Sequence, residues 1–423
     1  MLPRRLCGTL FAAALLLTTL LPGPAPAQGT QQPFTVGFGM ALTGGLAPIG
    51  KAALLAMQIW EEEINAKGGL LGRPVKLVYY DDQSNPATVP GIYTKLLDVD
   101  KVDIAVSGYA TNMIAPAMPL MIQRKRTFLA LFGLAINSEF KYPNYFAIQP
   151  VGGPYPKQAF AEGFFAVAAA QNPKPQTLAI VGADAEFPHN AMEGAREVAK
   201  KHGFRIVYDK TYPPATSDYT PIVRAIQATN PDMVLVCSYP PDSVGIVRAA
   251  NEIGLKAKLF GGGMVGLQAA AIKMQLGPLM NGIVNYDFWL PVGAFKTPEA
   301  MAFIEKYQAR APGAGVDVLG YYLPPFAYAY MQVVQAAVEG AKGAADQQKL
   351  ADVLRAGTFK TIVGDIKFGA NGEWIEPRVL AVQYQGITGN NIEQFTDMSK
   401  IPILWPPSLK TGDVIYPYAD ARK

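Results

Sequence analysis

The chain of 423 residues has little of the chemistry on which enzymes and metal sites depend. Its cysteines are Cys7 and Cys237, and its histidines are His189 and His202. These residues do not have the spacing of metal ligands, and a Gly-x-Ser-x-Gly nucleophile elbow is absent from the sequence. A histidine without a positioned nucleophile and an orienting group is not a catalytic base. We therefore expect no enzyme activity, no catalytic residues, no metal and no cofactor.

A strong charge of one sign is also lacking. Lysine and arginine number 37 against 33 acidic residues, which gives a formal net charge of +4. No basic cluster with interleaved aromatic residues and no charged block occurs, so a nucleic-acid partner is not expected. Cys237 ends the buried-strand pattern Met233 to Cys237, which predicts a small core residue rather than a reactive thiol.

Long hydrophobic runs are absent apart from one near the N-terminus. Leu10 to Leu21 is apolar over 12 residues and follows two arginines, but it is too short to span a bilayer. The small residues Ala25 to Ala27 are typical of a cleavage site, so residues 1–27 are expected to be a secretory signal removed after Ala27. Cys7 precedes the apolar run, whereas a lipidated cysteine would follow it. We expect an exported protein of the periplasm.

The most informative segment lies at the start of the expected mature chain. Phe34 to Phe38 has the pattern of a buried strand, and Ala52 to Ala66 places apolar residues on one face at helical spacing. The glycine-rich loop Thr43 to Gly50 between them can present backbone N–H groups and a hydroxyl to a negatively charged ligand. A nucleotide P-loop is not expected, because Ala52 and Pro48 replace a magnesium-binding hydroxyl and a phosphate-binding N–H. The alternative is a glycine turn that only lets strand and helix pack closely.

Apolar runs alternate with helical patterns along the rest of the chain. The runs are Val75–Tyr80, Val102–Val106, Phe128–Leu131, Leu178–Val181, Arg205–Tyr208, Met233–Cys237 and Ile283–Tyr286. Such alternation predicts an α/β fold with parallel sheets and helices on both faces. The chain is longer than one hydrophobic core usually organises, so two lobes are expected. Residues 149–154, 285–291 and 358–364 are expected to cross between the lobes as a hinge.

Several segments in fixed order carry a family resemblance. They are Leu42–Gly50, Gly68–Pro74 with Tyr80–Asp82, Tyr212–Tyr219 with Asn230–Asp232, Val363–Gly372 and Trp405–Asp413. Over essentially its whole mature length, the chain resembles the type I periplasmic solute-binding proteins of the branched-chain amino acid and amide family. These proteins, of which the leucine/isoleucine/valine-binding protein is an example, are receptors of ABC importers.

The resemblance implies two doubly wound parallel-sheet lobes joined by a three-strand hinge, which close on a small solute at the carboxyl ends of strands. It also implies an ABC permease of the inner membrane as partner, and a monomer is expected. The expected domains are the signal peptide 1–27, a first lobe of 28–150 plus 288–358, a second lobe of 151–287 plus 359–395, and a C-terminal tail of 396–423 packing on the lobes.

The family's binding positions, carried onto this sequence, give a set of ligand-binding candidates. They are Thr43, Ile49, Tyr109, Ala110, Thr111, Leu134, Ala135, Ile136, Phe187, Tyr239, Gly263, Met264 and Tyr322. Family members that hold an α-amino acid use a threonine where Ile136 stands and an acidic residue where Gly263 stands. An ammonium group enclosed without such partners costs several kcal/mol. The resemblance and its two departures therefore imply a solute without a cation.

The side chains at the candidate positions favour an apolar or aromatic body for the solute, stacked between Phe187, Tyr239 and Tyr109. A carboxylate would be held by the Thr43 and Thr111 hydroxyls. Backbone N–H groups of glycine turns at 44–45 or 261–263 would add to this grip.

The sequence thus predicts a receptor of an ABC importer that closes on a small apolar or aromatic monocarboxylate. Two alternatives stay open. One is a receptor for branched-chain amino acids or amides, and the other is an exported ligand sensor with the same fold. Export argues against a cytoplasmic regulator.

Overall fold

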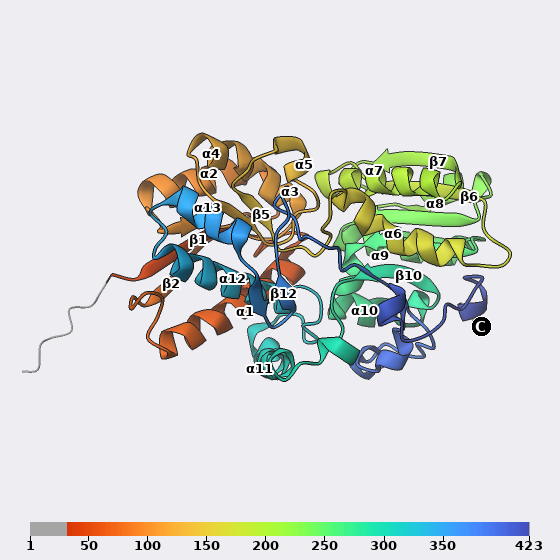
Figure 1. The fold of residues 1–423 in the computed structure, drawn as a ribbon. Coiled ribbons are helices and arrows are strands. Elements are labelled where there is room, and N and C mark those ends of the chain that lie inside the picture. The colour runs from red at the N-terminus through yellow and green to blue at the C-terminus, as the bar shows by residue number, and fades with distance from the viewer. Residues whose placement is uncertain (1–31, 423) are drawn as a thin grey trace, which may run out of the picture. The chain divides into compact units, whose positions relative to one another are not determined.

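The computed structural model describes residues 32–422, and the expected signal peptide lies outside them. The described residues from Pro33 onward form one compact unit. The helices are α1 (Ala47–Ala66), α2 (Val89–Thr94), α3 (Thr111–Ile114), α4 (Met118–Gln123), α5 (Asn137–Phe140), α6 (Pro156–Ala169), α7 (Glu186–Lys201), α8 (Thr220–Ala228), α9 (Pro240–Ile253), α10 (Ala270–Leu276), α11 (Pro298–Ala314), α12 (Pro324–Ala341) and α13 (Gln347–Ala356) (Figure 1). The strands are β1 (Phe34–Met40), β2 (Val75–Asp81), β3 (Ile104–Ala105), β4 (Phe128–Ala130), β5 (Tyr145–Ala147), β6 (Thr177–Ala183), β7 (Arg205–Tyr212), β8 (Met233–Ser238), β9 (Leu259–Met264), β10 (Ile283–Asp287), β11 (Phe359–Thr361), β12 (Gly364–Ile366), β13 (Leu380–Gln383) and β14 (Ile403–Trp405).

The opening segment forms strand, loop and helix, as the sequence predicts. The buried face of α1 includes Ala53, Met57 and Trp60, which lie at helical spacing. Gly50 lies in the first turn of α1, where a Cβ atom would come within 2.1 Å of the Ala41 carbonyl oxygen. Only glycine permits this approach of helix to strand. Gly50 therefore allows the helix and the strand to pack closely. Close packing was the alternative interpretation of this glycine-rich loop, in place of an anion-binding site.

The first sheet is parallel and has the strand order β2-β1-β3. The parallel strands β4 and β5 extend this arrangement on the far side of β3. The link is made by Ser107 N–H, which donates to the Leu129 carbonyl oxygen at 2.9 Å, and by the parallel bridge between Tyr109 and Phe132. Helices α1 and α12 pack on one another beside this sheet.

The second sheet has seven strands in the order β14-β13-β10-β9-β8-β6-β7. The strands from β10 to β7 are parallel, and β13 and β14 add antiparallel pairs at one edge. Every residue of β8 is buried, including the free Cys237. Burial raises the pKa of its thiol, and the prediction of an inert core cysteine is consistent with this setting.

The mixed edge and five of the strands were not predicted from sequence. They are β5, β9, β12, β13 and β14. Residues 261–263 of β9 were interpreted as a glycine turn, and this interpretation is wrong, because β9 pairs with β8 on one side and with β10 on the other. A Cβ atom on Gly261 would lie 1.7 Å from the Val284 carbonyl oxygen, so close strand packing explains this glycine.

The chain passes from β10 of the second sheet to α11, which packs on α1, as expected for residues 285–291, and it also passes between the two sheets at residues 150–153 and 369–378. The last two segments run side by side, since Gly153 N–H donates to the Trp374 carbonyl oxygen at 2.7 Å and Arg378 N–H donates to that of Pro150 at 2.8 Å. Residues 358–364, expected to be a crossing, instead include β11, which forms a hairpin with β12 and contacts α12. The boundaries of the lobes and of the tail stay predictions.

A group of buried polar atoms without hydrogen-bond partners lies at the crossing segment 369–378 and the neighbouring strand β5. It comprises Tyr145 Oη, both carboxylate oxygens of Glu373, Trp374 Nε1, and Nε and Nη2 of Arg378. We call these four residues the crossing cluster. Burial raises the pKa of Glu373 to about 8 and lowers that of Arg378 to about 10. Neither residue forms an ion pair with a described residue, and the guanidinium carbon of Arg378 lies 5.0 Å from the centroid of the Trp374 ring.

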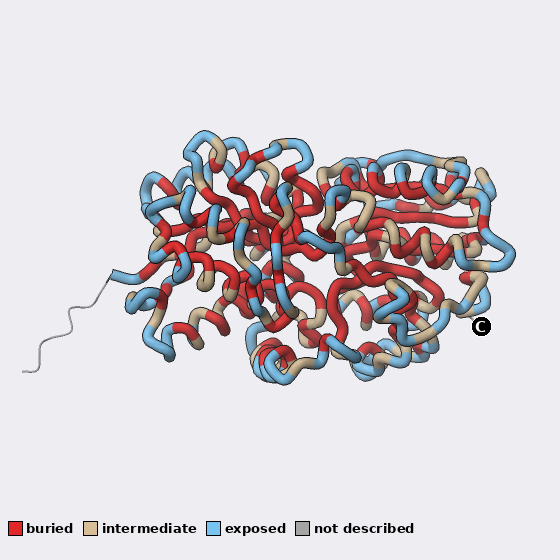
Figure 2. The backbone as a smooth tube through the Cα atoms, in the orientation of Figure 1, coloured by how far each residue is buried: buried red, intermediate tan, exposed pale blue. Residues whose placement is uncertain are grey.

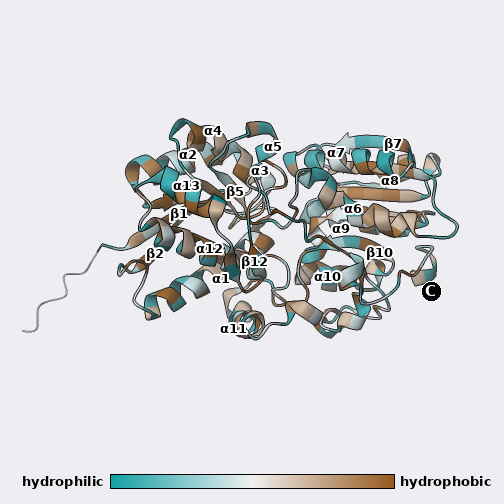
Figure 3. Cartoon of the chain, in the orientation of Figure 1, coloured by the Kyte–Doolittle hydropathy of each residue, from teal (hydrophilic) through white to brown (hydrophobic). Residues whose placement is uncertain are grey.

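The buried residues follow the strands of both sheets (Figure 2). Hydrophobic residues dominate the central strand β8 of the larger sheet, whereas hydrophilic residues are frequent along its edge strand β7 and along α7 (Figure 3). Among residues 32–422, no helix combines the length and the apolar character needed to cross a membrane.

Candidate functional site

A small cavity lies where loops from the two sheets meet, and we call it the intersheet cavity. Its volume is about 20 Å³. It is lined by Tyr109, Ala110, Thr111, Phe132, Gln149, Phe187, Tyr239, Val265 and Tyr322. Most of these residues come after the carboxyl end of a parallel strand. The strands are β3, β4 and β5 on the side of the first sheet and β6, β8 and β9 in the second sheet. Open α/β sheets place their ligands at such ends.

Two asparagines join the two sides of this site. Asn112 Oδ1 accepts a hydrogen bond from the Phe187 N–H at 3.1 Å and another from the Tyr239 hydroxyl at 2.9 Å. Asn190 Nδ2 donates to the Leu134 carbonyl oxygen at 2.9 Å. Sequence analysis identified neither asparagine, because an amide in a loop or helix carries no distinctive pattern.

Aromatic rings form most of the wall of the intersheet cavity. Phe132 contacts Tyr322 edge to face, with the ring centroids 5.6 Å apart, and Phe187 lies 5.4 Å from Tyr239. The Tyr322 hydroxyl lies 2.8 Å from that of Tyr286 in a buried pair. These rings make the cavity suitable for an apolar or aromatic group.

The polar groups of the cavity are neutral, and none of its lining residues is charged. Burial raises the pKa of Tyr109, Tyr239 and Tyr322, so their hydroxyls stay protonated at neutral pH. Thr111 Oγ1 accepts a hydrogen bond from the Leu134 N–H at 3.0 Å, which leaves its own proton free to be donated elsewhere. Gln149 is 4% exposed, and its Oε1 atom is buried without a partner.

The structure brings six of the sequence-predicted residues together at this cavity. They are Tyr109, Ala110, Thr111, Phe187, Tyr239 and Tyr322. Ala110 has a φ angle of 86°, which is a strained value for a residue with a Cβ atom, and such strain is common at ligand sites. The role of each residue in binding stays a prediction.

Thr43 does not line the cavity and is exposed in its loop. Its hydroxyl donates to Asp81 Oδ2 at 2.6 Å and its N–H donates to Asp81 Oδ1 at 3.1 Å. Although burial raises the pKa of Asp81, hydrogen bonds from Thr43 and its neighbours lower it overall. Both donors of Thr43 thus hold this carboxylate, in place of the solute carboxylate that we expected at this loop.

The remaining predicted residues are buried beside the cavity or behind it. Ile49, Leu134, Ala135 and Ile136 are 4% exposed or less and do not line the cavity. Met264 N–H donates to Asn285 Oδ1 at 3.0 Å inside the second sheet. These positions thus belong to the packed surroundings of the site.

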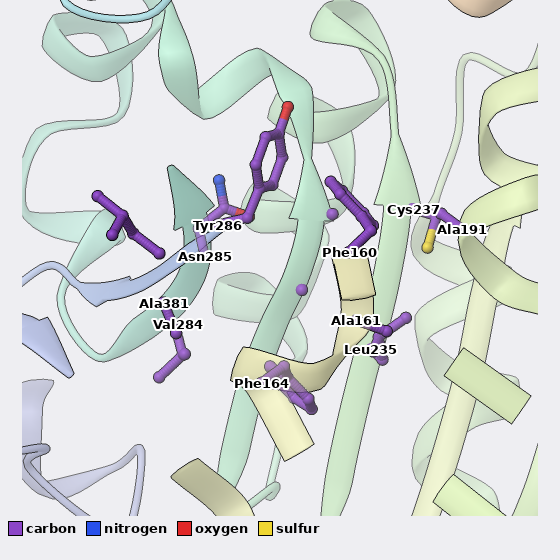
Figure 4. A pocket seen from close by; sticks show the side chains of 13 residues that line it. Phe160, Ala161, Phe164, Ala191, Leu235, Cys237, Val284, Asn285, Tyr286 and Ala381 are labelled. Carbon is purple, nitrogen blue, oxygen red and sulfur yellow. The ribbon is translucent and has the colours of Figure 1, made fainter. Parts of the chain in front are cut away.

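Gly263 lines a second cavity, between α6 and the second sheet (Figure 4). This cavity also has a volume of about 20 Å³. Phe160 and Tyr286 lie side by side in its wall, with their ring centroids 4.8 Å apart. Phe160 contacts Phe187 as well, so these rings lie between the two cavities. Gly263 is therefore separated from the intersheet cavity by a layer of aromatic side chains.

Three residues of the intersheet cavity were not predicted. Phe132 directly follows the predicted strand Phe128 to Leu131, so its position at a strand end was a usable signal. Gln149 follows β5, a three-residue strand that the sequence pattern did not identify. Val265 follows β9, whose glycines were interpreted as a turn.

Two α/β sheets whose strand ends meet at a mainly aromatic cavity have the architecture expected of a type I solute-binding protein. The chain belongs to the periplasmic binding protein family, whose sequence model matches residues 33–386. The chain is also similar to proteins that are named for binding branched-chain amino acids. The Leucine-, isoleucine-, valine-, threonine-, and alanine-binding protein of Pseudomonas aeruginosa is 24% identical over 332 residues, which cover 78% of this chain and 84% of the relative. The Leu/Ile/Val-binding protein of Escherichia coli is 23% identical over 336 residues, which cover 79% and 86%.

Solved structures share the fold. A solute-binding protein of an ABC transporter from R. palustris, in complex with benzoate, has a TM-score of 0.73 at 16% identity and covers 90% of this chain and 98% of its own. The branched-chain amino acid transporter substrate binding protein LivJ from Streptococcus pneumoniae, in complex with isoleucine, has a TM-score of 0.71 at 18% identity and covers 91% and 100%. At the level of the family, these proteins bind solutes and are not enzymes.

Proposed function

We propose that this protein is the extracytoplasmic receptor of an ABC importer and that it closes on a small carboxylate with an apolar or aromatic body. The observation that carries this proposal is the intersheet cavity, which has an aromatic wall and no charged lining residue. The complex of a structural neighbour with benzoate agrees with this class of solute.

The lack of charge argues against a free amino acid. An α-ammonium group enclosed here would lose its hydration and find no carboxylate among the lining residues. An unpaired buried charge of this kind costs several kcal/mol. A carboxylate differs, because neutral O–H and N–H donors can stabilise it without a counter-ion.

Donors for a carboxylate are present in the cavity. The Thr111 proton is available, since Oγ1 already accepts from Leu134 N–H. The buried Tyr109 hydroxyl, which lines the same cavity, stays protonated. Hydrogen bonds to a charged acceptor are roughly twice as strong as neutral ones. We propose Thr111 and Tyr109 as the carboxylate-binding pair.

Binding requires the two sides of the site to separate and close again. The cavity of about 20 Å³ is far smaller than the roughly 150 Å³ that holds one benzene ring. Solute entry must therefore move the aromatic side chains and open the hydrogen bonds of Asn112 and Asn190, which form again when the two sides close. A solute that contacts both sides binds a closed form better than an open one, and it shifts the population by that difference.

A branched-chain amino acid receptor is the second candidate, and the relatives named for leucine, isoleucine and valine favour it. An exported sensor would need the same closing motion and would differ only in its partner. We propose periplasmic localisation, action as a monomer, and an inner-membrane ABC permease that recognises the closed form. ATP hydrolysis by the importer would then drive transport.

A thermal-shift screen of residues 28–423 tests the choice of solute. Leucine, acetamide, butyrate and benzoate represent the competing classes. A ligand that binds only the folded state raises the melting temperature with the logarithm of its concentration over Kd. We expect a rise with benzoate and none with leucine. A rise with leucine alone would establish the second candidate instead.

A further inference from the structure

We infer that Gln149 makes the intersheet cavity selective for aromatic acids whose ring also carries a hydroxyl group. This inference rests on the proposed function and goes beyond it, because it assigns a specificity-determining residue and narrows the class of solute. It follows from the unpartnered oxygen of a buried amide at the cavity.

Gln149 differs from the other buried glutamines of the protein. Gln268 Nε2 donates to the Tyr286 carbonyl oxygen at 2.6 Å. Gln383 Nε2 donates to the Gly282 carbonyl oxygen at 3.1 Å, and its Oε1 accepts from Ile415 N–H at 2.7 Å. The side chains of Gln268 and Gln383 therefore hydrogen-bond within the fold. Gln149 is equally buried and lines the cavity, yet its Oε1 has no donor.

Tyr239, Tyr322 and Thr111 already have partners at the cavity, and Tyr109 is the donor proposed for the carboxylate. The Tyr239 hydroxyl donates to Asn112, and the Tyr322 hydroxyl is paired with Tyr286. Thr111 accepts from Leu134. The Gln149 carbonyl is thus the acceptor that a ligand can still satisfy.

A carboxylate cannot satisfy this acceptor, because an ionised carboxylate has only acceptors. Its oxygens would face the amide oxygen with both lone-pair regions opposed. A hydroxyl group on the ring, in contrast, can donate to Gln149 while the carboxylate takes the Thr111 and Tyr109 donors. The donors and the unpartnered acceptor of the cavity therefore suit two different ends of a solute, one ionised and one hydroxylated.

The expected discrimination is large enough to measure. A site built around a buried polar group rejects an analogue that leaves the group unpaired. One unsatisfied buried acceptor corresponds to a loss of about 10- to 100-fold in affinity. A purely apolar pocket would instead disfavour the added hydroxyl group, because the group would be buried without a hydrogen-bond partner.

Isothermal titration calorimetry of residues 28–423 with benzoate and with 2-, 3- and 4-hydroxybenzoate tests this inference. We expect at least one hydroxylated acid to bind at least about tenfold more tightly than benzoate. The variant Gln149→Met keeps the length of the side chain and removes its hydrogen bonding. It should lose that preference, with weaker binding of the hydroxylated acid and unchanged or tighter binding of benzoate.

Asn144→Leu is the matched control. Asn144 Oδ1 is also buried without a partner, but Asn144 does not line the cavity. This variant should keep the wild-type preference. Equal affinity of the wild type for benzoate and for every hydroxylated acid would overturn the inference, as would a preference that persists in Gln149→Met.

The wild-type titrations also distinguish failure of the inference about Gln149 from failure of the proposed function. Binding of benzoate without any gain from a hydroxyl group would overturn the role of Gln149 and leave the proposed function standing. If none of the four acids binds, both the proposed function and this inference fail. The wild-type titrations decide between these outcomes even if Gln149→Met does not fold.

Discussion

The intersheet cavity and the crossing cluster both bury polar atoms without partners, but they bury different kinds of group. At the cavity the unpartnered atom is a neutral amide oxygen of Gln149, beside space that a solute can enlarge and occupy. In the crossing cluster the unpartnered groups include the carboxylate of Glu373 and part of the Arg378 guanidinium. These lie on a segment that joins the two sheets, and neither residue lines the intersheet cavity.

The difference indicates what each region can contribute. An unsatisfied group at a cavity is stabilised when a ligand arrives, so it adds to affinity and selectivity. An unsatisfied charge inside a connecting segment can be relieved only by a proton, by water or by movement of the chain. We expect the first region to control which solute binds, and the second to control stability and its dependence on pH.

The largest effect is expected from Glu373→Gln. Burial raises the pKa of Glu373 from 4.5 to about 8 in the folded chain. The folded state therefore holds a proton that the unfolded state loses, and stability is lost as pH rises from 4.5 through 8. Glu373→Gln should remove this loss. The difference in free energy of unfolding between the variant and the wild type should be about 3 to 4 kcal/mol more in favour of the variant at pH 8 than at pH 5.

Urea unfolding at the two pH values measures this prediction. Glu376→Gln is the control, because Glu376 is exposed on the same segment. It should change stability little at either pH. Parallel pH profiles for the wild type and Glu373→Gln would show that Glu373 is not the titrating group.

The next largest effect is expected from Asn112→Ala. This substitution removes the acceptor of two hydrogen bonds that join the two sides of the site, from Phe187 and Tyr239. Each bond contributes about 1 kcal/mol, so the closed form should be weakened and solute affinity should fall by roughly tenfold or more. Calorimetric titration measures the change. His189→Ala, at a partly exposed residue paired with Asp184, should leave affinity unchanged.

A smaller effect is expected from Thr111→Val. This change keeps the shape of the side chain, removes the proposed carboxylate donor and leaves Leu134 N–H without its acceptor. Benzoate affinity should fall by about fivefold to tenfold. Thr111→Ser should restore most of it. If affinity is equal in Thr111→Val and wild type, Thr111 does not hold the carboxylate.

The smallest effect is expected from Gly263→Ala. The added Cβ atom would lie 3.2 Å from Phe160 Cε1 and 3.5 Å from Cys237 Sγ, in the second cavity. The ring must shift by a few tenths of an ångström, so the melting curve should correspond to a change below about 1 kcal/mol. Solute selectivity should not change. A loss of benzoate binding here would connect the second cavity to the site.

Much of the fold could be predicted from the order of apolar runs, because long buried strands have a clear pattern. Some strands lack such a pattern, and β5 and β9 show two reasons. β5 has only three residues, and β9 contains glycines whose role depends on backbone atoms of neighbouring strands. No local pattern reports such a contact.

The candidate site was likewise predicted only in part, because some of its contacts depend on the tertiary fold. Tyr109, Phe187 and Tyr239 lie near strand ends and at positions that match the family, and the structure brings them together. Gln149 follows a strand that was not identified. Thr43 was assigned to the solute because its loop has free donors in the sequence, but its partner Asp81 comes from a neighbouring strand. Pairings of this kind depend on the tertiary fold.

The most direct test of the proposed function is a calorimetric titration of residues 28–423 with three ligands that differ in charge: benzoate, benzylamine and leucine. Benzoate and benzylamine both carry an aromatic ring, so they separate the effect of charge from that of the apolar body. A cavity with aromatic walls, neutral donors and no charged lining residue predicts binding of benzoate and no detectable binding of benzylamine or leucine. Binding of leucine, with benzoate inert, would contradict the proposal and would mean that a carboxylate from elsewhere in the chain reaches the ammonium group.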